Sequence, residues 1–172
     1  MRIGATPRLL QRAKTGTLGD MASAQANVEP TIELVPDANA EELARRIRQA
    51  LTRHNELKTG DGRWRSLVLC LTDATGQTIG GLVGESFWNA LHIEVLWVAD
   101  EHRGRGYGTR LMQGAEMEAR SRGVGIIHLS TYSFQAPTFY ERLGYTKFGE
   151  LADTPKGAKR MWYVKRLIDH VA

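Results

Sequence analysis

One stretch of the chain constrains its fold more than any other: Val98–Met112, with the sequence V-A-D-E-H-R-G-R-G-Y-G-T-R-L-M. An apolar run, Ile93–Val98, leads into it, and a helical pattern follows. Its three alternate glycines adopt backbone angles that other residues resist, and they let a ligand approach the main chain closely. We expect the following helix to begin near Gly106 or Tyr107, with unpaired N–H groups in its first turn. Strand, glycine-rich turn and helix N-terminus together predict a site for a phosphate group.

Two common phosphate-binding motifs do not fit this stretch. The Walker A loop needs Lys-Ser or Lys-Thr after its glycines, and the dinucleotide fingerprint needs a glycine at the position of Thr109. The pattern that fits is R-x-x-G-x-G, formed by Arg103, Gly106 and Gly108. The alternative interpretation is a strand-to-helix turn that is rich in glycine only because it packs tightly.

Length and charge limit the class of protein. A chain of 172 residues fits one domain, and its formal charge of +4 suits an anionic cofactor without demanding nucleic acid. The single Cys70 excludes an intrachain disulfide, and its place in the apolar run Leu67–Leu71 predicts a buried thiol and a cytoplasmic protein. No apolar run approaches the ~20 residues of a membrane span, so we expect no membrane association. Residues 1–27 predict a poorly defined N-terminal tail or leader before a domain over residues 28–172.

The pattern of apolar residues predicts an α/β fold with a mixed sheet. Alternation or continuous apolar runs predict strands, and apolar residues at helical spacing predict helices. A helix between two strands also predicts that these strands run parallel. The expected strands are Thr31–Val35, Trp64–Thr72, Thr78–Trp88, Leu91–Val98, Val124–Ser130, Tyr145–Leu151 and Lys159–Leu167. Three helices are expected: the first begins after an Asn39 cap, the second runs from near Gly106 to just before Gly123, and the third spans Phe134–Leu143.

Three features together resemble the GNAT superfamily of N-acetyltransferases. They are R-x-x-G-x-G, the order of the elements, and the segment S-F-Q-A-P-T-F-Y-E-R-L-G-Y at Ser133–Tyr145. The resemblance covers about Thr31 to Leu167. It implies a mostly antiparallel sheet of about six or seven strands with flanking helices. At its centre lies a β-loop-α-β unit that binds acetyl-CoA, a cosubstrate that needs no metal.

The resemblance also implies which residues hold acetyl-CoA. The thioester carbonyl receives the backbone N–H of Val98, with Leu96 and Trp97 alongside. Gln135 lies near the family's asparagine and close to the pantetheine arm. The diphosphate meets the loop and the helix start, that is Arg103, Gly104, Arg105, Gly106, Tyr107, Gly108 and Thr109. Of these, Arg103 is expected to shape the loop rather than contact the ligand.

Acetyl transfer to an amine requires a base for the amine and an acid for the leaving sulfur. Tyr140, at the family's tyrosine position, is the candidate acid, and the alternative is that it only packs. His92 and Glu94 share parity with Leu96 and Val98, so we expect all four on one sheet face. Glu94, acting through a water, is the first candidate base and His92 the second. Many family members rely on neither.

These observations predict an acetyl-CoA-dependent N-acetyltransferase that works by direct attack in a ternary complex. A small amine is preferred over a protein as acceptor, and specificity would be set at the F-W-N-A-L turn and the D-T-P-K-G loop. The resemblance implies a homodimer, with Trp162 and Tyr163 as contact candidates. The rivals are a non-catalytic sensor of coenzyme A and, third, a nucleic-acid binder. The spacing of the histidines and Glu94 favours no metal site.

Overall fold

The computed structural model describes residues 30–167, except the side chain of Ala38. The chain divides into two compact units, residues 1–45 and 46–172. Helix α1 (Asp37–Thr59) begins in the first unit and ends in the second, with an acidic residue in its first turn and Lys58 in its last, which suits the helix dipole. No helix within residues 30–167 is both long and apolar enough to cross a membrane.

The first unit corrects one predicted strand. Residues 30–36 have no regular secondary structure, so the strand expected at Thr31–Val35 is wrong. Ile32 and Leu34 are exposed, and no strand there supplies the backbone partners that an alternating segment needs. The helix begins at Asp37, two residues before the expected Asn39 cap. Residues 1–27, the predicted tail, lie outside the described residues, and the predicted domain boundary stays a prediction.

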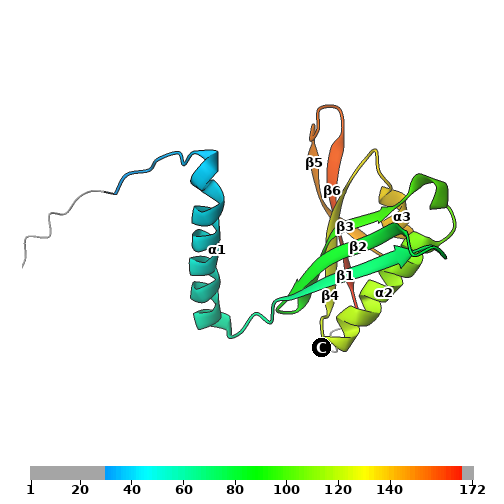
Figure 1. Cartoon of the computed structure of the whole chain (residues 1–172), viewed down its shortest axis with the longest axis horizontal. Helices are drawn as coiled ribbons and strands as arrows, with labels where there is room; N and C mark the ends of the chain where they lie inside the picture. The colour runs from blue at the N-terminus through cyan, green and yellow to red at the C-terminus, as the bar shows by residue number, and fades with distance from the viewer. Residues whose placement is uncertain (1–29, 168–172) are drawn as a thin grey trace, which may run out of the picture. The chain divides into compact units, whose positions relative to one another are not determined.

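In the second unit, the described strands, which are labelled in Figure 1, form one six-stranded sheet. Their order in the sheet is β1-β2-β3-β4-β6-β5. The only parallel pair among them is β3 with β4, as the helix crossover predicted. The mixed, mostly antiparallel α/β sheet is therefore confirmed. The strands are β1 (Arg65–Thr72), β2 (Thr78–Phe87), β3 (Ala90–Val98), β4 (Ile126–Tyr132), β5 (Thr146–Ala152) and β6 (Lys159–Arg166).

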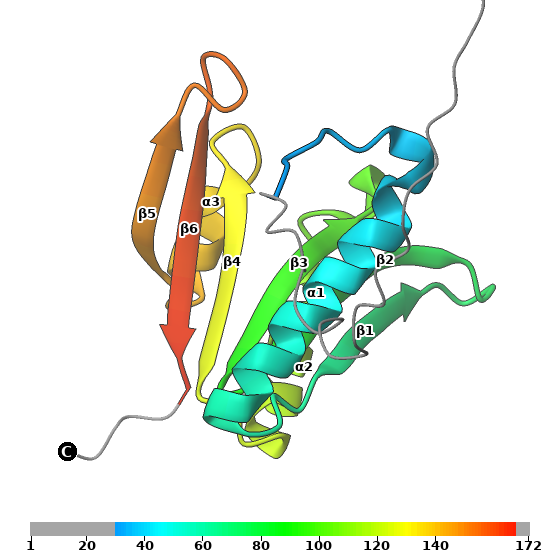
Figure 2. The ribbon, with the colours of Figure 1, turned by 90° about the vertical axis from the view of Figure 1, so that its left-hand side faces the viewer.

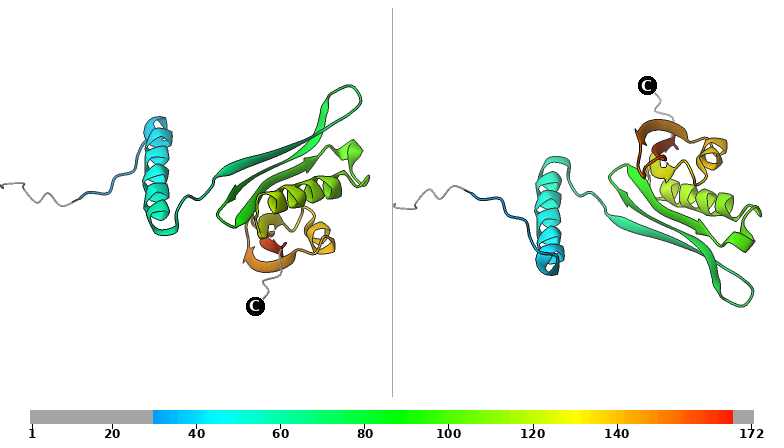
Figure 3. Two further views of the ribbon diagram at one scale, coloured as in Figure 1. Left: turned by 90° about the horizontal axis from the view of Figure 1, so that it is seen from below. Right: turned by 90° about the horizontal axis from the view of Figure 1, so that it is seen from above.

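Helix α2 (Tyr107–Ser121) packs along one face of β1, β2 and β3 (Figure 3). It begins where the glycines predicted, and Gly123 follows its end with a φ of 72°. A short 3-10 turn, η1 (Asp100–His102), joins β3 to the glycine loop. The third helix, α3 (Pro137–Arg142), begins with proline in its first turn and is shorter than predicted.

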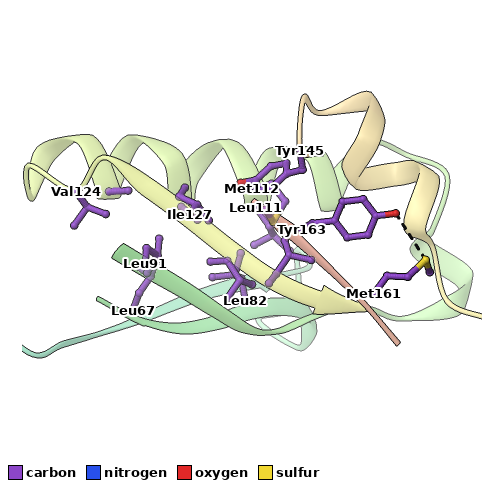
Figure 4. Close-up of a cluster of buried hydrophobic side chains, with 14 residues drawn as sticks. Leu67, Leu82, Leu91, Leu111, Met112, Val124, Ile127, Tyr145, Met161 and Tyr163 are labelled. Carbon is purple, nitrogen blue, oxygen red and sulfur yellow. Dashed lines mark hydrogen bonds between the residues drawn. The ribbon is translucent and has the colours of Figure 1, made fainter. Parts of the chain in front are cut away.

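The core lies between α2 and the sheet, and Figure 4 shows the side chains that fill it. Leu82, Met112 and Ile127 are completely buried there. So is Tyr163, whose hydroxyl donates to the Glu141 carboxylate over 2.8 Å and lies 4.0 Å from the Met161 sulfur. Burial and Glu141 raise the pKa of Tyr163 to about 12. Because Tyr163 is a core residue, its predicted role in a dimer contact is wrong, while dimerisation itself stays a prediction.

Cys70 is exposed, so the prediction of a buried thiol is also wrong. In β1 the burial alternates: Leu67, Leu69 and Leu71 pack towards the core, whereas Val68 and Cys70 point to the other face. The continuous apolar run suggested a strand covered on both faces. The cytoplasmic location inferred from this thiol stays a prediction.

Candidate active site

Strands β3 and β4 separate before they end. Their pairing runs only from Ala90↔Ile126 to Ile93↔Leu129, yet β3 continues to Val98 and β4 to Tyr132. Figure 2 shows the two ribbons adjacent at the start of β3 and apart at their carboxyl ends. The carboxyl half of β3 therefore has backbone groups on this edge without a partner strand, which makes the gap a place for an extended ligand.

A bulge in β3 accompanies the separation. Gly84 of β2 pairs with Ile93 and Val83 pairs with Val95, so Glu94 is an extra residue without a partner. Such an extra residue bends a strand and increases its twist. A Cβ on Gly84 would lie 2.5 Å from the carbonyl oxygen of His92, so the strands approach here as closely as only glycine permits. The exposed Glu94 is thus placed at the bend.

The bulge also corrects the predicted parity of β3. Leu91 and Ile93 before it, and Leu96 and Val98 after it, all pack towards the core. His92, between two core residues, lies on the opposite face. There its ring stacks on that of His128 from β4, with centroids 4.8 Å apart and an interplanar angle of 14°. The expectation that His92, Glu94, Leu96 and Val98 all share one sheet face is therefore wrong.

The backbone N–H of Val98 points into the gap. In an antiparallel pair, successive N–H groups alternate between the partner strand and the other edge. The N–H of Ala99 donates to Ile79 of β2 over 2.9 Å, so that of Val98 must point away from β2. The Arg103 Nε donates to the Val98 carbonyl over 3.0 Å, and its Nη2 pairs with Asp100 at 2.8 Å. Arg103 therefore fixes the end of β3, in agreement with its expected role in loop shape.

The glycine loop leaves donors open at the start of α2. Gly104 and Gly106 have φ values of 73° and 80°, in the left-handed region that favours glycine. Gly106 caps α2 without a side-chain hydrogen bond, and the first helical N–H, that of Arg110, donates to Gly106. The preceding amides, those of Tyr107, Gly108 and Thr109, therefore have no acceptor within the helix. The Arg103 amide is not among the open donors, because it bonds to Asp100.

Gly108 has a different role from the other two glycines. A Cβ there would lie 3.3 Å from the Phe139 ring, so the missing side chain lets α2 approach α3 closely. The alternative interpretation, glycine for tight packing, is thus correct at this one position. Phe139 itself is half-buried against the core.

Tyr140 is half-buried between aromatic rings. Its ring centroid lies 5.0 Å from that of Phe139, 6.2 Å from Tyr145 and 6.1 Å from Tyr163. Burial raises the pKa of Tyr140, which keeps the phenol protonated. Within residues 30–167 its hydroxyl has no hydrogen-bond partner, so it remains able to donate to a ligand.

Gln135 fixes the end of β4. Its side-chain oxygen accepts hydrogen bonds from the Thr131 hydroxyl at 2.9 Å and from the Tyr132 amide at 3.0 Å. Only its amide nitrogen remains for a pantetheine arm, and that contact stays a prediction.

The two loops expected to set specificity lie at opposite ends of the sheet. The F-W-N-A-L turn precedes β3, so eight residue steps, roughly 26 Å, separate it from Val98. There Phe87 stacks on Trp64 with centroids 4.7 Å apart. The D-T-P-K-G loop joins β5 to β6, and the start of β6 pairs with the carboxyl end of β4, beside the gap. Only the second loop adjoins the candidate site.

A groove of about 660 Å³ runs between β1 and α2, lined by residues that include Leu69, Tyr107 and Met117. It adjoins the edge strand β1, two strands away from the β3–β4 gap. We therefore assign the acyl site to the gap and not to this groove. Among residues 30–167, no three His, Cys, Asp or Glu side chains gather in a way that would hold a metal ion.

Comparisons with known proteins agree with this geometry. Residues 32–145 match the Acetyltransferase (GNAT) family. Acetyltransferase Atu2258 of Agrobacterium fabrum is 34% identical over 132 residues, which cover 77% of this chain and 94% of that protein. Blasticidin-S acetyltransferase of Streptomyces morookaense is 43% identical over 94 residues, covering 54% of this chain and 68% of that one.

Among solved structures, an acetyltransferase from Bacillus cereus is similar with a TM-score of 0.69 and 30% identity, covering 80% of this chain and 97% of that chain. The parted strands, the glycine loop and these relatives lead to one assignment. The chain belongs to the GNAT family and is an N-acetyltransferase.

Proposed function

We propose that this enzyme transfers the acetyl group of acetyl-CoA to a primary amine of a small molecule, by direct attack in a ternary complex. One observation carries the proposal: the Val98 amide points into the gap between β3 and β4. The open amides at the start of α2 lie at the same end of β3.

The two sets of amides suit the two parts of the cosubstrate. The N–H groups of Tyr107, Gly108 and Thr109 would bind the diphosphate, because a helix N-terminus attracts anions. The Val98 N–H would donate to the thioester carbonyl, whose oxygen gains negative charge as the amine attacks. Leu96 and Trp97 would flank the acyl arm as it extends along β3.

Proton transfer completes the reaction. An alkyl amine with a pKa of ~10.4 is mostly protonated at neutral pH, so a base is useful. Glu94 at the bulge is the first candidate, through a water, and His92 beside His128 is the second. As the N–C bond forms and the C–S bond breaks, the amine proton passes to the base, and Tyr140 gives its proton to the sulfur.

The relatives support a small-molecule acceptor. Blasticidin-S acetyltransferase, named for a small molecule, is similar over about half of this chain. We therefore prefer a small-molecule amine to a protein amine. We also retain the homodimer as part of the proposal, with Trp162 as the remaining contact candidate.

A turnover assay tests these roles. Purified enzyme, acetyl-CoA and a panel of amines that includes blasticidin S would be followed by thiol release. We expect Tyr140→Phe and Glu94→Gln each to lower kcat by about 10- to 100-fold with little change in the KM for acetyl-CoA. Glu41→Gln, an exposed residue of α1 with the same change of charge, is the control. Unchanged turnover in both Tyr140→Phe and Glu94→Gln would contradict the roles of Tyr140 as acid and Glu94 as base.

The rival function is a sensor that binds coenzyme A without turnover. It needs the loop and the gap but neither Tyr140 nor Glu94. Calorimetric binding of acetyl-CoA to a protein that acetylates no amine in the panel would favour this rival.

A further inference from the structure

Arg160, at the start of β6, was not anticipated from the sequence as a site residue. Its neighbour Met161 and the next alternate residue, Tyr163, are buried in the core, so Arg160 and Trp162 lie on the opposite sheet face. This is also the face of His92 and His128: β4 alternates in the same way, with Ile127, Leu129 and Thr131 buried.

The Arg160 guanidinium is held in place by three groups. Its Nε and Nη2 both donate to the Ser130 hydroxyl oxygen, over 3.2 and 2.9 Å. Its Cζ lies 5.7 Å from the centroid of the Tyr132 ring and 5.2 Å from that of Trp162. Stacking on aromatic rings orients a guanidinium and leaves its N–H groups free at the edges. The side chain therefore reaches from β6 over β4.

One edge of this guanidinium remains available. Ser130 uses the Nε side, and Nη1 has no acceptor among residues 30–167. In the same part of the chain no buried side-chain nitrogen lacks a partner, so Nη1 of the half-buried Arg160 must be reachable by solvent. The Nη1 and Nη2 hydrogens at that edge form the fork that matches a carboxylate.

No carboxylate of the described chain fills this position. The acid of the neighbouring hairpin, Glu150, is bound by Lys147 at 2.9 Å and by Lys159 at 2.7 Å. Arg160 forms no ion pair within residues 30–167. A half-buried, oriented cation with no counter-charge in the described chain is suited to an anion that arrives with a ligand.

The position of Arg160 indicates that this ligand is the acceptor amine. Arg160 pairs with Tyr132, the last residue of β4, and so lies at the end of β4 where the gap to β3 is open. The diphosphate amides belong to α2, which covers the other face of the sheet. Glu94 and His92, the candidate bases, come from the strand across the gap.

We propose that Arg160 binds a carboxylate of the acceptor, so that the substrate of this enzyme is an amine that also carries a carboxylate group. The inference rests on the proposed function and names its substrate class. The guanidinium lies over β4 and the acetyl group lies between β4 and β3. About one strand spacing, ~4.8 Å, therefore separates the amine from the carboxylate. A spacer of a few carbon atoms, as in 4-aminobutyrate, spans that distance.

Matched acceptor pairs test the proposal. The pairs are 3-aminopropanoate, 4-aminobutyrate and 6-aminohexanoate, each with its uncharged amide. KM values are measured for every acceptor and for acetyl-CoA, with the wild type, Arg160→Gln and Arg160→Lys. Arg166→Gln is the control, because this exposed arginine lies at the other end of β6. Thermal unfolding of each variant detects loss of structure.

We expect the wild type to have a KM for the best acid about 10- to 100-fold below that for its amide, since charge-assisted bidentate bonds are strong. Arg160→Gln should abolish this preference while the KM for the amides and for acetyl-CoA stays constant. Arg160→Lys should restore part of it. Equal KM values for acid and amide in the wild type, an equal rise for both in Arg160→Gln, or a higher KM for acetyl-CoA would each overturn the proposal.

A separate measurement distinguishes this proposal from the proposed function. If no amine is acetylated, the proposed function fails, and calorimetry of 4-aminobutyrate and its amide with coenzyme A present decides the role of Arg160. Binding of the acid alone, lost in Arg160→Gln, supports the site. Absence of binding, or binding that survives Arg160→Gln, refutes it.

Discussion

Gly106 determines the shape of the glycine loop at the level of a single residue. Its φ of 80° strains any residue with a side chain, by about 1–2 kcal/mol. We expect Gly106→Ala to move the open amides of α2 and to raise the KM for acetyl-CoA roughly tenfold, because such strain relaxes by changing the backbone. Steady-state kinetics with varied acetyl-CoA measures the change.

Gly76→Ala is the matched control for that substitution. Gly76 has a φ of 84° in the turn between β1 and β2, and an added Cβ would meet nothing within 4 Å, as at Gly106. It should lose a similar amount of stability and keep its KM for acetyl-CoA. If the KM for acetyl-CoA rose in both variants, the rise in Gly106→Ala would be explained by lost stability alone.

His128 links stability to pH. Burial, and then the charge of His92, lower its pKa below the ordinary 6.5. The unfolded chain therefore binds a proton at a higher pH than the folded chain does, so stability is lost as the pH falls from 6.5 to the pKa of the folded state. We expect His128→Gln to flatten this part of the pH dependence. Urea unfolding at about pH 7.5 and about pH 5.5 measures the slope on either side of the ordinary histidine pKa.

An exposed histidine of α1 gives the control: His54→Gln should leave the slope unchanged. A wild-type slope retained in His128→Gln would show that other groups cause the pH dependence.

Residues of the loop could be predicted from the sequence, and those of the proposed carboxylate site could not. Arg103 and Gly106 stand in one local motif whose spacing implies its backbone. Arg160 and Ser130 are thirty residues apart and meet only because β6 pairs with β4. A strand pattern shows which residues share a face, but not which strand lies beside it.

At the level of the elements, Lys165 joins three of them. Its Nζ donates to both carboxylate oxygens of Glu116 on α2, at 2.8 and 2.9 Å, and to the carbonyl of Leu143 after α3, at 2.8 Å. The Glu116 side chain is only 10% exposed. We expect Lys165→Met to destabilise the enzyme by about 3 kcal/mol, because the buried Glu116 carboxylate then keeps only the Tyr145 hydroxyl at 3.3 Å and Arg120 at 3.9 Å. The melting temperature should fall by roughly 6–12 °C.

Glu42→Gln is the corresponding control, since the Glu42–Arg45 pair is exposed and should contribute at most about 0.5 kcal/mol. Thermal unfolding of both variants makes the comparison. Equal losses in the two variants would contradict a special role for the buried pair.

The order of the elements from β1 onward could be predicted, but the bulge could not. In A-L-H-I-E-V-L-W-V the residues alternate as far as Val95 and are then continuously apolar, and a continuous apolar run does not show where an extra unpaired residue lies. The incorrect face for His92 follows directly from this. The incorrect strand at Thr31–Val35 has the same origin: alternation reports the suitability of a segment for a sheet and not the presence of a partner strand.

On the scale of the whole sheet, β1–β3 and β4–β6–β5 are joined by four paired positions, Ala90↔Ile126 to Ile93↔Leu129. The sequence patterns did not predict this weak junction. The order of the strands around it followed from the helix crossover, which required β3 and β4 to be parallel neighbours.

We expect this junction to give the cosubstrate a mechanical role. A pantetheine chain bound between the carboxyl ends of β3 and β4 would replace the hydrogen bonds that these two strands do not make with each other there. The enzyme would therefore be more rigid with acetyl-CoA bound than without it. Saturation at a hundred times Kd should add about 2.7 kcal/mol of stability. Slower amide hydrogen exchange in both Leu96–Val98 and Ser130–Tyr132, on the two sides of the gap, would indicate this effect. Protection limited to α2 would mean that β1–β3 and β4–β6–β5 still move independently.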